Sequence, residues 1–118
     1  ERGATTSLDY AILTNEIIKG TFGMKVDEYK EFKSLKRENL RDHMTDLELI
    51  LTMLGEATPT KITKDRDSKK FKDLKKDASD GGKVAGRTRK DIEKQSNKKI
   101  ISNDNYTDTK ESQKRFES

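Results

Sequence analysis

The sequence predicts an all-α fold: a small domain of four to five helices, with a long, basic, glycine-interrupted helix and a disordered C-terminal tail. Apolar residues recur every three to four positions in several separate stretches, which is the period of one face of an α-helix. A helix-capping motif stands directly before the most apolar of these stretches. The run at residues 99–102, which could be a strand or an extended tether, is short.

The first predicted helix begins at Leu8 and carries Ile17 on its apolar face. Ser7 is the expected N-cap, because a serine hydroxyl can accept a hydrogen bond from an otherwise unpaired backbone N–H. Gly20 and Gly23 are expected to end this helix, since glycine adopts the backbone conformation that often terminates one.

A second, shorter helix is predicted over residues 26–32. Tyr29, Phe32 and Leu35 are spaced by three, which places them on one face of a helix. Leu40 continues an apolar face beyond this segment.

The clearest local signal is a capping box, in which Thr45 is followed three residues later by Glu48. The threonine hydroxyl and the glutamate carboxylate each accept a hydrogen bond from the other residue's backbone N–H. The helix that follows is expected to form the centre of the core. It should end near Thr58, because Pro59 disfavours helical geometry in the residue before it. Residues 60–67 are then predicted to form a loop.

The long basic helix is predicted from residue 68 to about residue 95, with small residues in its middle that include Gly81 and Gly82. Glycine in a helix interior costs roughly 1 kcal/mol relative to alanine. Either the backbone packs closely against another helix there, or the helix breaks in two at these glycines. We favour a continuous or kinked helix whose small residues form a close-packing seam.

Residues 8–102 are interpreted as one helical domain and residues 103–118 as a polar tail. Hydrophobic residues make up 29% and charged residues 41% of the 118 positions. Globular domains average about 45–50% apolar and about 25% charged, so the core should be thin and completed by self-association or another domain. The predicted core consists of Ile12, Ile17, Tyr29, Phe32, Leu40, Leu47, Ile50, Leu51, Leu54 and Leu74.

Charge is distributed unevenly along the chain. Residues 1–60 hold 8 Lys/Arg and 11 Asp/Glu, whereas residues 61–118 hold 18 Lys/Arg and 11 Asp/Glu. Helical spacing stacks four cations of the second half on one face, where they could follow a nucleic-acid backbone. The alternative interpretation is an ordinary solvated helix face, because acidic residues are interleaved. The candidate nucleic-acid-binding residues are Lys83, Arg87, Lys90 and Lys94.

No catalytic, cofactor or metal site is predicted, and an enzyme is not expected. His43 is the sole histidine and the chain has no cysteine, which excludes disulfides, thiolate zinc sites and a cysteine nucleophile. Residues 81–87 resemble a phosphate-binding loop only superficially, because the required Gly-Lys-Ser/Thr is missing. No apolar run approaches the roughly 20 residues that span a bilayer, and no signal peptide is visible. We therefore expect a cytoplasmic protein without membrane or small-molecule partners.

Several blocks stand in order along the chain: YAILTNEI (10–17), EYKEFK (28–33), KRENLRDHMT (36–45), LEL (47–49), MLGEA (53–57), GGKVAG (81–86) and RK (89–90). Taken in order, these blocks resemble the C-terminal region of BRO-family, prophage antirepressor-like proteins, often grouped with DNA-damage-inducible protein D. The resemblance implies a regulatory, DNA-linked phage or stress-response setting and an N-terminal DNA-binding domain that this sequence lacks. It supplies no catalytic residues.

The sequence is compatible with two functions. The first is an interaction or oligomerisation module of a longer antirepressor-like or DNA-damage-inducible regulatory protein, from which this chain would be a piece. The second is direct nucleic-acid binding through the basic second half.

Overall fold

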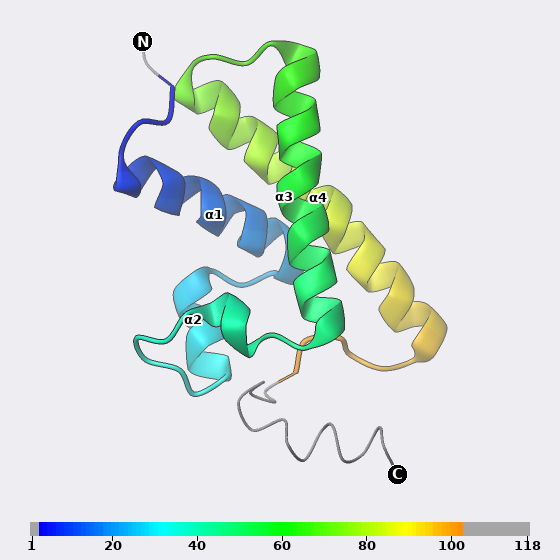
Figure 1. Cartoon of the computed structure of the whole chain (residues 1–118). Helices are drawn as coiled ribbons and strands as arrows, with labels where there is room; N and C mark the ends of the chain where they lie inside the picture. The colour runs from blue at the N-terminus through cyan, green and yellow to red at the C-terminus, as the bar shows by residue number, and fades with distance from the viewer. Residues whose placement is uncertain (1–2, 103–118) are drawn as a thin grey trace.

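The computed structural model describes residues 3–102, and within that range it contains helices and no strand. The elements are α1 (Ser7–Phe22), α2 (Val26–Phe32), the single-turn 3₁₀ helix η1 (Leu40–His43), α3 (Asp46–Arg66) and α4 (Phe71–Ser96) (Figure 1). The predicted all-α fold of four to five helices is confirmed. The predicted tail, residues 103–118, lies outside the described residues.

The two longest helices, α3 and α4, cross each other near their midpoints (Figure 1). Helix α1 lies beside the same crossing and packs on α4 as extensively as α3 does. Helices α2 and η1 lie together below α1 (Figure 1). Helix α4 is thus the element on which the two other long helices converge.

Small residues allow the three long helices to approach this closely. A Cβ atom on Gly82 would lie 2.7 Å from the carbonyl oxygen of Ile17, and Gly86 is in similar contact with Gly20 of α1. On the α3 side, Gly81 meets the ring of Pro59. The predicted close-packing seam is therefore confirmed, and α4 is continuous through its glycines.

The predicted end of the third helix near Thr58 is wrong, because α3 continues through Pro59 to Arg66. The region 60–67, expected to be a loop, is mostly the last two turns of this helix. An interior proline forgoes one backbone hydrogen bond and costs about 3 kcal/mol in an isolated helix. Here Pro59 is buried against Gly81, so tertiary packing outweighs the local preference.

The caps follow local sequence rules with one correction. At α3, the Glu48 N–H donates to the Thr45 hydroxyl and the Thr45 N–H donates to the Glu48 carboxylate at 3.0 Å, so the predicted capping box is confirmed. At α1 the N-cap is Thr6 rather than Ser7. The reason is spacing: Asp9 stands three residues after Thr6 and completes a second capping box.

The hydrophobic core is small and is built mainly by α1, α2, η1, the first turns of α3 and the segment after α4. Tyr29, Leu40 and Leu51 are buried as expected, whereas Ile12, Ile17, Leu54 and Leu74 are only half-buried. Phe32, Leu47 and Ile50, which were predicted to be core, are exposed. The buried hydrophobic cluster consists of Ile18, Phe22, Tyr29, Leu35, Leu40, Met44, Leu51 and Ile100.

The orientation of α3 explains this correction. Its buried positions include Glu48, Leu51, Thr52, Gly55 and Pro59. Apart from Leu51, these residues are smaller or more polar than Leu47 and Ile50, and Gly55 and Pro59 are the ones that meet α4 closely. The larger apolar side chains consequently face outward.

The segment after α4 is an extended tether that returns to the core. Ile100 is buried in the hydrophobic cluster, and its backbone N–H donates to the Glu93 carboxylate at 2.9 Å. Of the two conformations that the sequence left open for residues 99–102, the tether is therefore the one observed.

Candidate interaction surfaces

The four cations predicted to bind nucleic acid, Lys83, Arg87, Lys90 and Lys94, lie on α4 and are all exposed. Their positions place them on one face of the helix. The opposite side of α4 carries the buried Gly81, Gly82, Ala85, Gly86 and Arg89. The four side chains make no ion pair with any residue from 3 to 102, and their charges are therefore available to solvent.

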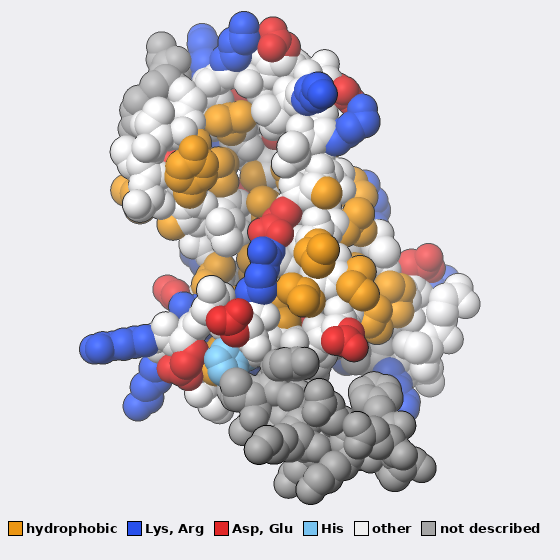
Figure 2. Space-filling model, in the orientation of Figure 1, with side chains coloured by type: hydrophobic (Ala, Val, Ile, Leu, Met, Phe, Trp, Pro, Cys, Tyr) orange, Lys and Arg blue, Asp and Glu red, His pale blue; other side chains and the backbone are white. Residues whose placement is uncertain are grey.

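A second surface is the outer face of α3, which is apolar. Leu47, Ile50 and Met53 are 43%, 57% and 55% exposed. Together with the half-buried Leu54 and the exposed Ala57, they form what we call the α3 apolar face. Figure 2 shows hydrophobic side chains gathered over α3 in this view. Leu47, Ile50 and Leu54 of this face were predicted to lie in the core, but Leu47 and Ile50 are exposed and Leu54 is half-buried.

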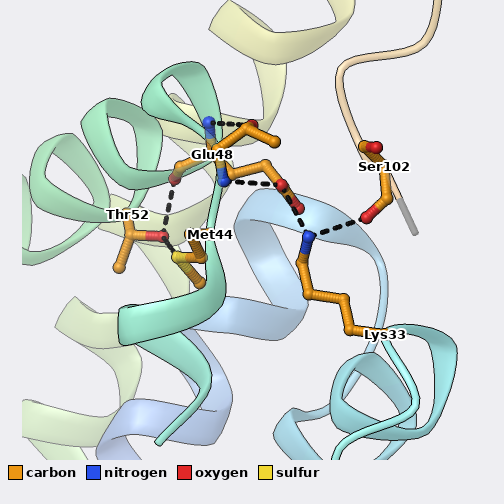
Figure 3. Close-up of polar contacts among 6 residues, drawn as sticks. Lys33, Met44, Glu48, Thr52 and Ser102 are labelled. Atoms are coloured by element: carbon orange, nitrogen blue, oxygen red, sulfur yellow. Dashed lines mark hydrogen bonds and ion pairs between the residues drawn. The ribbon is translucent and has the colours of Figure 1, made fainter. Parts of the chain in front are cut away.

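A buried ion pair fixes the base of α3. Lys33, at the end of α2, donates to the Glu48 carboxylate at 2.9 Å and to the Ser102 carbonyl oxygen at 2.8 Å (Figure 3). The side chains of Lys33 and Glu48 are fully buried. This contact joins α2, α3 and the C-terminal tether. Sequence reasoning missed it, since the capping role of Glu48 gave no sign of a buried lysine beside it.

A second polar cluster joins the C-terminal end of α3 to α4. Asp77 is buried and accepts hydrogen bonds from Thr63 at 2.8 Å and from Arg66 at 2.9 Å. Burial acts to raise the pKa of Asp77, but hydrogen bonds from Ser68, Thr63 and Arg66 outweigh it and lower this pKa below its ordinary value. The cluster holds the two helical turns that follow Pro59 against α4.

A third polar contact joins α1 to α4. The guanidinium of Arg89 donates to the Thr21 carbonyl oxygen at 2.7 Å and to the Glu93 carboxylate at 2.9 Å. Burial acts to raise the pKa of Glu93, but the hydrogen bond from the Ile100 N–H and the charge of Arg89 lower it overall. Arg89, unlike the four cations of the opposite face, therefore has a structural role.

Catalysis and metal binding both require several polar or titratable side chains that converge at one place. His43 is buried, and within residues 3–102 no group of His, Cys, Asp or Glu side chains could hold a metal ion. A hollow of about 450 Å³ opens between α1, η1 and α3, and its carboxylate, Glu56, is paired with Arg41. None of the helices in the described range is both long and apolar enough to cross a bilayer.

The chain matches no known protein-family model, no curated protein and no solved structure.

Proposed function

We propose that this chain is an interaction module that self-associates through the α3 apolar face. The observation that carries the proposal is the exposure of Leu47, Ile50 and Met53 on successive turns of one helix. Burying such side chains contributes about 25 cal/mol per Å² of apolar surface. A contiguous exposed apolar patch of this kind is typical of a protein–protein contact.

The charges that flank the face favour a second copy of the chain as the partner. Asp46 stands at the N-terminal end of the face and Lys61 lies beyond its C-terminal end, and both are exposed. If two α3 helices pack antiparallel about a twofold axis between Met53 and Leu54, Asp46 of each copy faces Lys61 of the other. Opposite charges then meet at both ends of the contact, because a twofold axis makes the two ends equivalent.

The same twofold arrangement matches the apolar residues. Ile50 faces Ala57 of the second copy, and Met53 faces Leu54. A large side chain thereby lies opposite a small or half-buried one, so the two surfaces can pack without leaving a gap between them. Lys61 is ion-paired with Asp65 one turn further along the same helix, but both side chains are more than half exposed, so exchange of partners costs little.

The resemblance of the sequence blocks to BRO-family, prophage antirepressor-like proteins supports a regulatory setting for such a module. In that setting it would be the C-terminal interaction and oligomerisation part of a longer DNA-linked regulator. Self-association would then present two copies of whatever domain the module is joined to, which raises effective affinity without any new contact.

The test is the molar mass of the chain by multi-angle light scattering over roughly a hundredfold range of concentration. We expect a dimer that Ile50→Asp converts to a monomer. Leu8→Asp is the matched control, because Leu8 is equally apolar and 69% exposed but lies on α1. A wild-type chain that stays monomeric throughout would refute self-association.

The charge pairing has its own test. Lys61→Glu should weaken the dimer by placing an acid opposite Asp46, and the double variant Lys61→Glu, Asp46→Lys should restore it. If the double variant is weaker than the single one, the antiparallel register is wrong even where a dimer exists.

A further inference from the structure

Helix α4 carries a longer row of cations than the four that sequence spacing singled out. At 100° per residue, six exposed basic side chains fall within an arc of about 60° on its outer face. With a rise of 1.5 Å per residue, the row is about 33 Å long. We call this row the basic stripe, and it consists of Lys72, Lys76, Lys83, Arg87, Lys90 and Lys94.

The acidic residues of α4 leave most of the stripe unpaired. Asp73 and Asp91 lie about 40° beyond its edge and, within the described residues, make no ion pair with it. Asp77 is bound by Arg66 and Glu93 by Arg89, both away from it. Within the described residues, Lys76 is the one member that has an ion pair, with Asp80, and Asp80 is shared with Arg66. Asp80 lies at one edge of the stripe, about 60° from Lys83.

The stripe has a cost within the fold. Lys72 and Lys76, Lys83 and Arg87, and Lys90 and Lys94 are like-charged pairs four residues apart, and each pair destabilises a helix slightly. Unlike Arg89, which ties α4 to α1, five of the six cations contact no acid that would offset this repulsion. Acids also stand three or four residues from members of the stripe, but only Asp80 forms an ion pair with one of them in the described residues. The remaining cations are therefore available to an external anionic partner.

We propose that the basic stripe binds the phosphate backbone of duplex DNA. This binding site is separate from the α3 apolar face and does not rest on the proposed self-association. The phosphates of a duplex carry a dense, regular negative charge, and cations that neutralise them release bound counterions. Helix α4 is continuous from Phe71 to Ser96 and its other side is packed against α1 and α3, so the stripe runs along one unbroken helix face.

Two other anionic partners fit less well. Single-stranded nucleic acid is bound by aromatic side chains on which bases stack, and the stripe contains none. A membrane surface is bound most firmly by a basic helix that also inserts its apolar side among the lipids. The apolar and small side of α4 is already packed against α1 and α3, so it cannot insert.

The test measures binding of a fluorescently labelled duplex by anisotropy at several salt concentrations. The logarithm of the affinity should fall by about 0.9 for each phosphate contact per decade of salt, so a slope of about −3 to −5 is expected. The triple variant Lys83→Gln, Lys90→Gln, Lys94→Gln should reduce the steepness by about 2 to 3. Circular dichroism of each variant checks that the helices are intact.

The matched control removes the same charge elsewhere. Lys25→Gln, Lys36→Gln, Lys64→Gln changes three exposed lysines outside α4 and should leave the slope nearly unchanged. A further variant, Asp91→Asn, removes an exposed acid that lies one turn from Arg87 and from Lys94 on the same helix and should strengthen binding severalfold at low salt.

Four outcomes would overturn the proposal. They are no binding at low salt, equal losses in the two triple variants, tighter binding of a single strand than of the duplex, and equal binding of vesicles that contain anionic lipid. The monomeric Ile50→Asp chain serves as the second sample. Because the stripe lies outside the α3 apolar face, this chain should still bind DNA, so failure of self-association and failure of DNA binding are read separately.

Discussion

Gly82 of α4 lies against the main chain of α1 at Ile17, where a Cβ atom would come within 2.7 Å of the carbonyl oxygen. In an open helix, replacing glycine by alanine stabilises by about 1 kcal/mol. Here the added methyl group must push two helices apart, so we expect Gly82→Ala to destabilise the fold by about 2 kcal/mol. The free energy of unfolding in urea measures the change.

Gly23→Ala is the control for this substitution. No atom lies within 4 Å of a Cβ atom built on Gly23, but its φ of 76° is left-handed. Alanine there should cost about 1 kcal/mol through backbone strain alone. If Gly82→Ala instead stabilised the chain, the close approach of α1 and α4 would be wrong.

The buried pair of Lys33 and Glu48 gives a second prediction. Lys33→Met removes the cation and leaves the Glu48 carboxylate buried without it, which should cost about 3 to 5 kcal/mol. In the double variant Lys33→Met, Glu48→Gln, the remaining side chain is neutral and can still accept from the Thr45 N–H. The double variant should therefore recover a large part of the free energy of unfolding that Lys33→Met loses.

Urea unfolding of the two single variants and the double variant completes a thermodynamic cycle for this pair. The exposed pair Arg41 and Glu56 is the comparison, because surface pairs contribute less than about 1 kcal/mol. Additive losses at Lys33 and Glu48 would show that the two side chains do not act as a pair.

Features set by local spacing could be predicted from the sequence. The capping box at Thr45 depends on residues three positions apart, and it is observed. The glycines of α4 were compatible with a closely packed continuous helix and with a helix that breaks in two. Helical periodicity on both sides of them correctly favoured the continuous helix. The exposure of Lys83 and Arg87 followed from the same periodicity.

Features set by packing between helices could not be predicted in this way. Pro59 is a local signal to end a helix, and only its contact with Gly81 of α4 explains why α3 continues. Leu47 and Ile50 are large apolar residues of the kind that usually lies in a core. They are exposed because the opposite, smaller face of α3 is the one that can approach α4 closely, and spacing within α3 does not reveal that choice.

The buried hydroxyl of Tyr29 supports a third prediction. Tyr29 is fully buried, packs edge-on against Phe22 with ring centroids 4.9 Å apart, and its hydroxyl has no hydrogen-bond partner among the described residues. An unsatisfied buried polar group costs about 1 to 3 kcal/mol. Tyr29→Phe should therefore be neutral or stabilising by up to about 1 kcal/mol in urea unfolding.

Tyr29→Leu is the control for that substitution, because it removes the ring as well and should destabilise by about 1 to 3 kcal/mol. A clear loss of stability in Tyr29→Phe would mean that the hydroxyl has a partner after all, such as an ordered water molecule.

The last prediction concerns acid pH and the Asp77 cluster. Hydrogen bonds from Ser68, Thr63 and Arg66 lower the pKa of Asp77 in the folded chain, despite its burial. A carboxyl group whose pKa is lower in the folded state stabilises the fold above its unfolded pKa, and this contribution disappears as the pH falls through the folded value. Stability should therefore be steady near neutral pH and decline below the ordinary aspartate pKa of about 3.9.

Asp77→Asn should lower the free energy of unfolding at neutral pH and make its decline in acid shallower, because the titrating group is gone. Asp42→Asn makes the same charge change at an exposed position of η1 and should leave the acid profile close to that of the wild type. Urea unfolding at pH values from neutrality down to about 3 gives both quantities. An unchanged acid slope in Asp77→Asn would assign the acid sensitivity to other carboxylates, of which Glu93, with its own lowered pKa, is the next candidate.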